Sequence, residues 1–395
     1  MSKKNKKELN CRLGTVGGEA VLEGVMMKGK DGTMGVAVRK EDGSIVVTKQ
    51  KTTSIRKKHK ILNIPIVRGV VGMIESFLLS YKVLTISAET YGEGIEEEPS
   101  KFEKWLEKVF GKSLMDFVMV IASVLGVALA LGLFFFLPTI ITKSIDVLCV
   151  GGGELFGFWG DFFSQKTAFG EAWSLFVNSW SGYWSAISKE EIVGLGMWRN
   201  LIEGGIKILL FISYISLVSL MKDIRRTFQY HGAEHKSIFC YEAGEELTPE
   251  NVKKYSRYHP RCGTSFLFVM LIISVLIFSL PFVPWGNSFH RLLIKLPLMP
   301  LAIGLGFEFI MFAGKHDNWF IRLLSLPGLL MQRITTREPD EKQIEVAITA
   351  LKTALPEDFP DFVPPTEENL KKAAEEAAKA EEAAKAEQAS EENND

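Results

Sequence analysis

Cysteine and histidine are scarce in this chain, which has four cysteines and six histidines in 395 residues. The cysteines are scattered and form no C-x-x-C pair. This spacing excludes a disulfide framework of the kind found in small secreted proteins. It favours a reducing environment, such as the cytoplasmic face of a cell.

Net charge and a secretory leader are also lacking. The chain has 46 basic and 47 acidic residues and a formal net charge of −1. Residues 1–13 are lysine-rich and lead into no apolar segment, so we predict a basic cytoplasmic tail and not a cleaved signal peptide. No basic stripe with interleaved aromatic residues is present, which argues against a nucleic-acid partner.

Long apolar runs, in contrast, are abundant. Hydrophobic residues make up 47% of the chain and charged residues 24%, so the apolar residues must be concentrated in particular segments. Two uncharged runs, 117–137 and 264–283, and two weaker ones, 206–221 and 292–312, are candidate membrane-spanning helices. We therefore expect a mainly α, polytopic membrane protein with about four transmembrane helices.

Two N-terminal segments follow other patterns. Residues 14–60 alternate short apolar runs with turn residues, which predicts a small β module. Glu23 lies in one of these runs, either as a solvent-facing strand residue or as a functional carboxylate. Residues 61–100 are predicted to form an interfacial helix and a linker, because three charged residues interrupt the apolar pattern and make a span costly. A fifth span there would invert the topology of everything downstream.

Lysine and arginine set the expected orientation. They are frequent in residues 1–60, 101–112 and 222–261 and rare after the first span. This distribution predicts that those segments and both termini lie on the cytoplasmic side of the cell membrane, with the aromatic-rich region 138–200 on the opposite surface. The remaining assignments are a transmembrane domain at 101–335 with a cytoplasmic loop at 222–263, a cytoplasmic helix at 336–363, and a charged tail, disordered or a single helix, at 364–395.

One pair of histidines carries the best candidate site. The segment Tyr230-His-Gly-Ala-Glu-His-Lys contains H-x-x-E-H. On a helix, His231 and His235 lie on one face and could bind one cation, with Glu234 beside an open coordination position. This order is the inverted form of the zincin motif, in which two histidines hold zinc and a glutamate is the general base. The alternative is an interfacial helix with two histidines by chance.

A further ligand must come from another segment. Glu308, near the cytoplasmic end of the last predicted span, is the best third ligand, because an intramembrane carboxylate is costly unless it is paired or ligated. The alternative is a salt bridge between Glu308 and a nearby basic residue. Glu242, His259 and Cys262 are the other candidate ligands.

Basic residues crowd the same predicted face. They would suit an anionic lipid or a phosphorylated group, although positive-inside topology and headgroup contact explain them as well. Membrane lipids are the expected partners, and a membrane or cytoplasmic protein is a further candidate. The residues predicted to contact an anionic group are Arg225, Arg226, Lys236 and Arg261.

Several longer segments resemble one known family. They begin at Gly17 (GGEAVLEGVMM), Asp223 (DIRRTFQYHGAEHK), His259 (HPRCGTSFL) and Leu326 (LPGL, continued by TTREPD from Thr335). Together they resemble the YqhQ-like family of bacterial multi-pass membrane proteins over roughly residues 14–355. That family is a domain of unknown function labelled as a predicted metal-dependent enzyme. The resemblance implies a metal site at the H-x-x-E-H segment and no particular substrate, and likeness to inverted zincin peptidases is confined to the five-residue motif.

The combined expectation is a divalent-metal centre at the cytoplasmic face, with zinc as the preferred ion. Hydrolysis is the expected chemistry: the metal activates water, Glu234 takes its proton, and a carbonyl or phosphoryl oxygen is polarised. The substrate, whether a lipid, a phosphorylated group or a peptide, stays open. The alternatives, in order, are a membrane scaffold whose structural metal site would recruit His259 or Cys262, and a transporter.

Overall fold

A computed structural model describes residues 12, 14–58, 60–92, 198–279, 288–313 and 319–372, together with isolated positions between 121 and 145. Its contacts divide the chain into two compact units. The first contains residues 1–96, 217–266 and 313–395, and the second contains residues 97–216 and 267–312. The first unit is therefore built from three stretches that lie far apart in the sequence.

A four-stranded antiparallel sheet begins the first unit. Its strands are paired in chain order, β1-β2-β3-β4, by short connections. Gly32, between β2 and β3, has a φ of 89° and lies against the backbone of Thr52, so this turn requires a residue without a Cβ. The sheet confirms the predicted N-terminal β element. Its strands are β1 (Val16–Val21), β2 (Gly24–Gly29), β3 (Thr33–Arg39) and β4 (Ile45–Lys51).

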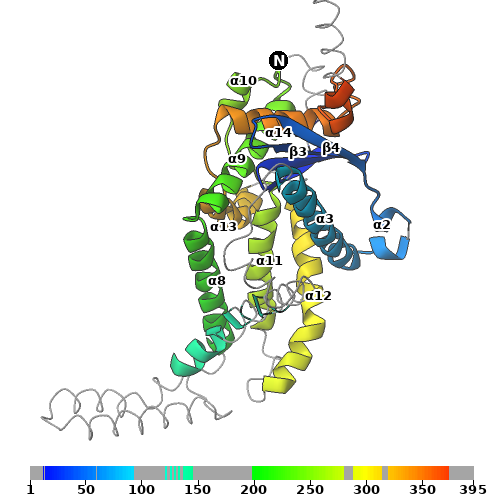
Figure 1. The fold of residues 1–395 in the computed structure, drawn as a ribbon. Coiled ribbons are helices and arrows are strands. Elements are labelled where there is room, and N and C mark those ends of the chain that lie inside the picture. Colours follow the sequence, from blue (N-terminus) through cyan, green and yellow to red (C-terminus); the bar gives the residue numbers. More distant parts are fainter. Residues whose placement is uncertain are drawn as a thin grey trace, which may run out of the picture. The chain divides into compact units, whose positions relative to one another are not determined.

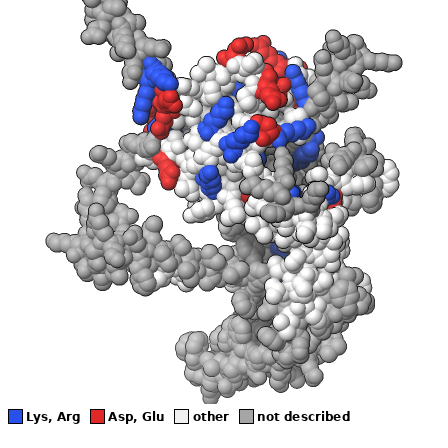
Figure 2. Space-filling model, turned by 90° about the vertical axis from the view of Figure 1, so that its right-hand side faces the viewer, with Lys and Arg blue, Asp and Glu red and all other residues white. Residues whose placement is uncertain are grey.

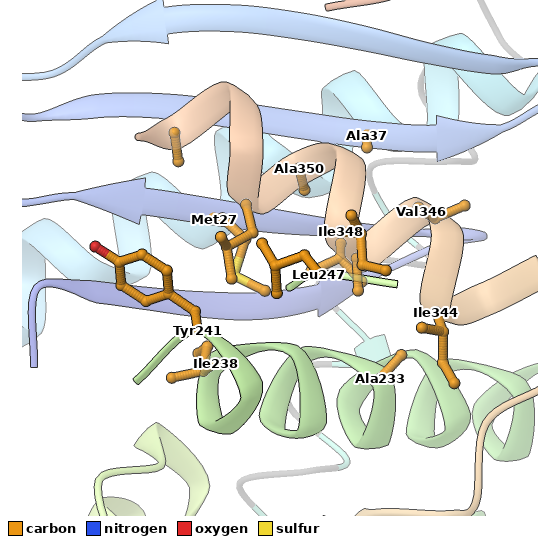
Figure 3. Packing of buried hydrophobic residues seen from close by; sticks show 14 of the residues in the cluster. Met27, Ala37, Ala233, Ile238, Tyr241, Leu247, Ile344, Val346, Ile348 and Ala350 are labelled. Carbon is orange, nitrogen blue, oxygen red and sulfur yellow. The ribbon is translucent and has the colours of Figure 1, made fainter. Parts of the chain in front are cut away.

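Helices α9 (Lys222–Ala243) and α14 (Glu341–Ala354) pack against the sheet and against each other (Figure 1). Because side chains alternate along a strand, Val25 and Met27 lie on one face of β2, and both belong to the core cluster that contains Ile344 and Leu351 of α14. Figure 3 shows Met27 and Ile344 among the side chains of this cluster. A capping box at Asp340, where its side chain accepts from the Gln343 N–H, begins α14. The core of the first unit thus joins the N-terminal strands to the C-terminal helix.

Helix α3 (Val67–Gly92) covers other residues of the same strands. Val83 packs with Val21, Met26 and Val36, which are fully or almost fully buried. The N-terminal half of α3 is bound to the segment that precedes it, because Glu75 accepts hydrogen bonds from the Ser54 hydroxyl and from the Ile55 N–H. The segment between the sheet and α3 contains α2 (Ile55–Lys58) and η1 (Lys60–Asn63).

The remaining helices complete the described chain. Helices α10 (Pro249–Lys253) and α13 (Trp319–Thr335) belong to the first unit. Most of α8 (Arg199–Val218), α11 (Gly263–Phe278) and α12 (Ser288–Ala313) belongs to the second. The prediction of a mainly helical protein with a small N-terminal sheet is therefore confirmed.

Within the described residues, two helices are long and apolar enough to cross a membrane, namely α3 and α8. The predicted span at 206–221 lies largely in α8. The span predicted at 264–283 overlaps α11, which is apolar but only 16 residues long as described. The span predicted at 292–312 falls in α12, which contains Pro297 and Pro300. The segment 117–137 and most of the aromatic region 138–200 lie outside the described residues. The count of four spans stays a prediction.

Candidate metal centre

Helix α9 brings the two histidines together. His231 and His235 are four residues apart on this continuous helix, and their ring centroids are 4.4 Å apart. The helix ends at Gly244, whose left-handed conformation lets its N–H bond to the carbonyls of Cys240 and Tyr241. Residues 230–238 are buried, because neighbouring segments surround this part of α9 on several sides.

Cys262 supplies a third donor from the loop that precedes α11. Its Sγ lies 3.2 Å from Nε2 of His231. One donor atom each from Cys262, His231 and His235 lie within 4.8 Å of one another, and all three residues are at most 8% exposed. Two imidazole nitrogens and one thiolate are a donor set that suits zinc. The three side chains therefore form a buried group that could hold a metal ion.

The tautomers of both histidines fit this role. Nδ1 of His231 bonds to the backbone oxygen of Thr335 at 2.8 Å, and Nδ1 of His235 bonds to that of Arg257 at 2.5 Å. A carbonyl oxygen only accepts, so this bonding assigns a hydrogen to Nδ1 of each ring and directs Nε2 toward the group. Nε2 of His235 is buried and has no hydrogen-bond partner. A buried imidazole nitrogen that lies beside a thiol and has no hydrogen-bond partner fits the role of a metal ligand.

Cys262 and His231 are coupled electrostatically in the metal-free protein. Burial lowers the pKa of His231, but Cys262 and, less strongly, Glu234 outweigh burial and raise it to about 9. Burial likewise raises the pKa of Cys262, and His231 outweighs it, which holds that pKa well below the usual thiol range. The two opposite shifts favour an ion pair between the thiolate and the imidazolium. A metal cation would replace the imidazolium proton as the positive partner of the thiolate.

Two carboxylates lie near the group. Glu234 is 5% exposed, and burial raises its pKa against the opposing effects of His235 and His231. Its Cγ lies against the backbone of Gly18 on β1, where a Cβ would come within 2.8 Å. The second carboxylate is that of Glu19, which follows Gly18 on β1. It accepts a hydrogen bond from Ser80 Oγ of α3 at 2.7 Å, and burial raises the pKa of Glu19. The N-terminal sheet thus borders the H-x-x-E-H helix.

Residues at the end of α13 hold the loop that carries Cys262. The fully buried Gln332 accepts from the His259 N–H at 2.8 Å and donates to the His259 carbonyl at 2.7 Å. It also donates to Ser265 Oγ at 2.7 Å, on the far side of Cys262. Three residues later, Thr335 provides the carbonyl that orients His231. Sequence reasoning missed Gln332, Thr335 and Glu19, although Thr335 begins one of the family-like segments and Glu19 lies within another.

The chain after Thr335 continues along α9. Gly232 lies so close to this segment that a Cβ would be 2.0 Å from the carbonyl oxygen of Arg337. The Arg337 N–H donates to the Phe228 carbonyl at 2.8 Å. Glycine at 232 is therefore required between the two histidine-bearing turns, because any side chain would push this segment away from the site.

Glu242 and His259, two of the predicted alternative ligands, lie beside the group and not within it. Glu242 accepts from the Gly14 N–H at 2.9 Å and pairs with Arg261. Nδ1 of His259 accepts from the Arg261 N–H at 3.3 Å, which leaves its hydrogen on Nε2, 3.8 Å from Glu242. Glu308 lies on α12 in the second unit and is not among the three converging donors. Its assignment as a ligand stays a prediction.

Three of the four predicted anion-binding residues pair with acids of the same unit. The ammonium of Lys236 is buried and bonds to Glu338 and to the Lys253 carbonyl, whereas Arg261 pairs with Glu242. Arg226 pairs with Glu23, and Arg225 is exposed. Figure 2 shows the same interspersion of basic and acidic side chains on one face of the molecule.

Glu23 occupies a position different from the predicted one. It lies in the turn between β1 and β2 with a φ of 50°, and not in a strand. Besides pairing with Arg226, it accepts a hydrogen bond from the Tyr230 hydroxyl at 3.2 Å. The carboxylate is therefore neither a solvent-facing strand residue nor one of the converging donors. It ties the sheet to α9 one residue before His231.

The contact between Gly18 and Glu234 can be tested with neighbouring glycines. Gly18→Ala should destabilise the first unit by about 1–3 kcal/mol, because the new methyl group meets Glu234, Met26 and Met27. Gly17→Ala should be close to neutral, since nothing lies within 4 Å of its added Cβ. Thermal unfolding of the two purified variants measures the difference. Equal unfolding temperatures would contradict the close packing of β1 on α9.

The proton position between Cys262 and His231 can be tested in metal-free protein. Because the pKa of Cys262 is lowered, its thiolate absorbance should persist well below the usual thiol pKa of about 8.5. In His231→Ala, only His235 still opposes the effect of burial on the thiol, so the thiolate should form at higher pH than in the wild type. The free energy of unfolding should depend on pH in the same way. The stabilisation from Cys262 is lost as the pH falls through its lowered pKa, and the stabilisation from His231 is lost as the pH rises through about 9.

The measurement is ultraviolet difference absorbance against Cys262→Ser across a pH titration. Cys240→Ser is the control, because burial raises the pKa of Cys240 to about 11 and its loss should leave the neutral-pH signal unchanged. A wild-type thiolate signal that appears only at alkaline pH would contradict the ion pair.

Comparison with known proteins agrees with the sequence resemblance. The family described as "Protein of unknown function (DUF1385)" matches residues 64–357. The "Uncharacterized protein YqhQ" of Bacillus subtilis (strain 168) is 32% identical over 340 residues, which cover 86% of this chain and 92% of that protein. No solved structure matches the chain. The match to the family over most of the chain, together with this relative, shows that the protein belongs to the DUF1385 family.

Proposed function

We propose that this protein is a membrane-embedded, metal-dependent hydrolase whose centre consists of His231, His235 and Cys262, with zinc as the ion. One observation carries the proposal. The Nε2 atoms of His231 and His235, whose rings are each fixed through Nδ1 by a backbone carbonyl, converge with the Sγ of Cys262. Three protein donors are the number that catalytic zinc sites use, because a tetrahedral ion then keeps one position for water or substrate.

Glu234 is the proposed general base. It follows His231 by three residues and precedes His235 by one, so its carboxylate borders the same centre. A bound metal ion would supply Lewis-acid activation of water at this place. Glu234 would take a proton from that water and return it to the leaving group, and its burial, which raises its pKa, makes the carboxylate a better proton acceptor. Gln332 and Thr335 would hold Cys262 and His231 in position during the reaction.

A structural metal site is the second candidate. The observation in its favour is the burial of the group, since His235 is only 1% exposed and Cys262 8%. A metal there would tie α9 to the loop before α11 and to the end of α13 without any chemistry. The two candidates differ in what they require of Glu234, which a structural site does not need as a base.

The fold also supports a membrane arrangement. The first unit combines residues before 97, from 217 to 266 and after 312. Because these segments share one hydrophobic core, they must lie on one side of a membrane. The chain between them must therefore cross an even number of times, which agrees with one pair formed by 117–137 and α8 and a second pair formed by α11 and α12. The predicted sidedness places this unit in the cytoplasm.

Helix α3 is assigned to the membrane surface under the same proposal. Its length and composition are those of a possible span, yet residues in both of its halves are bound to the chain that precedes it. Glu75 binds Ser54, and Ser87 Oγ donates to the Leu22 carbonyl. A helix held at both places cannot carry its end across the bilayer. Its exposed apolar residues suit the headgroup boundary, namely Ile74, Phe77, Leu78, Tyr81 and Leu84.

Metal content is the direct test of the centre. The purified full-length protein should hold about one transition-metal ion per chain, and Cys262→Ser should lose most of it because a hydroxyl is a poor zinc ligand. Cys240→Ser is the matched control, since Cys240 lies on α9 yet contacts the Glu246 carbonyl and not the centre. Elemental analysis after dialysis measures both. Equal metal in wild type, Cys262→Ser and a His231→Ala, His235→Ala double variant would remove the proposal.

Glu234→Gln separates catalysis from a structural role. The amide keeps the size of the side chain but cannot take a proton, so hydrolysis should fall by about 10²–10⁴-fold while folding and metal content stay near wild type. The measurement is turnover of a panel of model esters, phosphodiesters and fluorogenic peptides. Full activity in this variant would exclude the base. Loss of metal would instead make Glu234 a ligand, and Glu308→Gln with weakened metal retention would add Glu308 to the ligand set.

A further inference from the structure

The two edge strands of the sheet, β1 and β4, differ in whether another segment pairs with their outer backbone groups. At one edge, the Val47 N–H of β4 donates to the carbonyl of Pro365 at 2.9 Å, so the chain's own C-terminal segment covers part of this edge. At the other edge, β1 pairs with β2 along its whole length on one side only. Within the part of the chain that the structure describes, no backbone hydrogen bond joins residues 16–21 to any other segment. Alternate residues of β1 therefore direct N–H and C=O groups outward without a backbone partner.

The part of β1 that lies next to Glu234 has no side chains that would cover its backbone. Gly17 and Gly18 are exposed, and a Cβ added at Gly17 would meet nothing within 4 Å. Natural sheets usually blunt a free edge with charge, proline or a bulge, whereas two successive glycines leave the backbone open to close approach. The backbone of Gly18 also rests on the side chain of Glu234. A chain lying along β1 would thus run beside the proposed general base.

We propose that β1 binds a polypeptide segment as an added strand and that the centre cleaves peptide bonds in extended chain segments. This inference rests on the proposed hydrolase function and names its substrate class. An added strand lies about 4.8 Å from its neighbour and takes its hydrogen bonds from the backbone, so an extended peptide is the occupant that this edge fits. Recognition through the main chain tolerates many side-chain sequences.

The charges around the centre also favour a peptide substrate. Three of the four predicted anion contacts, Lys236, Arg226 and Arg261, are paired with Glu338, Glu23 and Glu242, and the fourth, the exposed Arg225, lies nine residues before Glu234 on α9. A site for a phosphorylated group or an anionic headgroup needs cations that are available to the ligand. The feature that is available beside Glu234 is neutral backbone. This favours an uncharged amide over a phosphoester as the bond that is cleaved.

The reaction balances without a further reactant. One water adds to one peptide bond: a C–O bond forms at the carbonyl carbon, and the C–N bond breaks. Glu234 takes a proton from the water and delivers it to the departing nitrogen. The products are one carboxylate terminus and one amine terminus, and no oxidation state changes.

The experiment compares metal-chelating probes on the zinc-loaded, full-length protein. Acetohydroxamate reports on the centre alone, and an alanine-rich tripeptide hydroxamate reports on the centre and the edge together. Calorimetry should show the tripeptide probe binding at least about tenfold more tightly, the factor expected for two backbone hydrogen bonds. Two further probes carry an N-methyl group on one or the other of two adjacent amides. Because a strand alternates, one methylated probe should lose the gain and the other should keep it.

A second readout does not depend on the metal. Hydrogen exchange of the amides in residues 16–21 should slow when the corresponding tripeptide amide, which lacks the chelating group, is added in excess. Absence of this protection, or equal binding of both methylated probes, would overturn the inference. Acetohydroxamate binding without any gain from the peptide would leave the hydrolase standing and remove the peptide edge. Failure of acetohydroxamate to bind would instead count against the metal centre, and protection of β1 that rises with protein concentration would assign the edge to a second copy of the chain.

Discussion

Two backbone carbonyl oxygens fix what the H-x-x-E-H helix can do. The carbonyls of Thr335 and Arg257 each take one imidazole hydrogen, and so turn the opposite nitrogen of His231 and His235 toward the same point. Without them, either ring could present a hydrogen to the site, and the pair would repel a cation. Both carbonyls come from segments outside α9, so the chemistry of the motif depends on tertiary structure even though its spacing is local.

Local patterns predicted the parts of the site that depend on local geometry. The i, i+4 spacing of the histidines requires only a helix, and the alternating N-terminal segment requires only strand pairing. The position of the third donor, Cys262, depends on a long-range contact. Cys262 approaches His231 because Gln332 clamps the backbone of His259, a contact that joins residues 73 positions apart. No periodicity in the sequence encodes that distance, and Cys262 was therefore one of several candidate ligands behind Glu308.

The predicted cation cluster shows a second limit of sequence reasoning. Lys236, Arg226 and Arg261 have the composition of an anion site, but each side chain meets an acid from another segment of the same unit. Those acids, Glu338, Glu23 and Glu242, are spread over more than 300 residues of sequence, so their pairing depends on the fold. Glu23 illustrates the point, because it was expected within a strand and instead occupies a turn with a positive φ that brings it to Arg226 and Tyr230.

The composition of the first unit has a consequence for how the protein is made. Its core contains β2 near the N-terminus and Ile344 and Leu351 of α14 near the other end of the described chain. During synthesis the strands emerge first, and one hydrophobic face stays uncovered until α14 has been made. The Gln332 side chain and the Thr335 carbonyl are also made late. A nascent chain that lacks residues 332–354 therefore has neither its completed core nor the contacts that orient His231 and the Cys262 loop, so the three donors can come together only after this last part of the unit has been made.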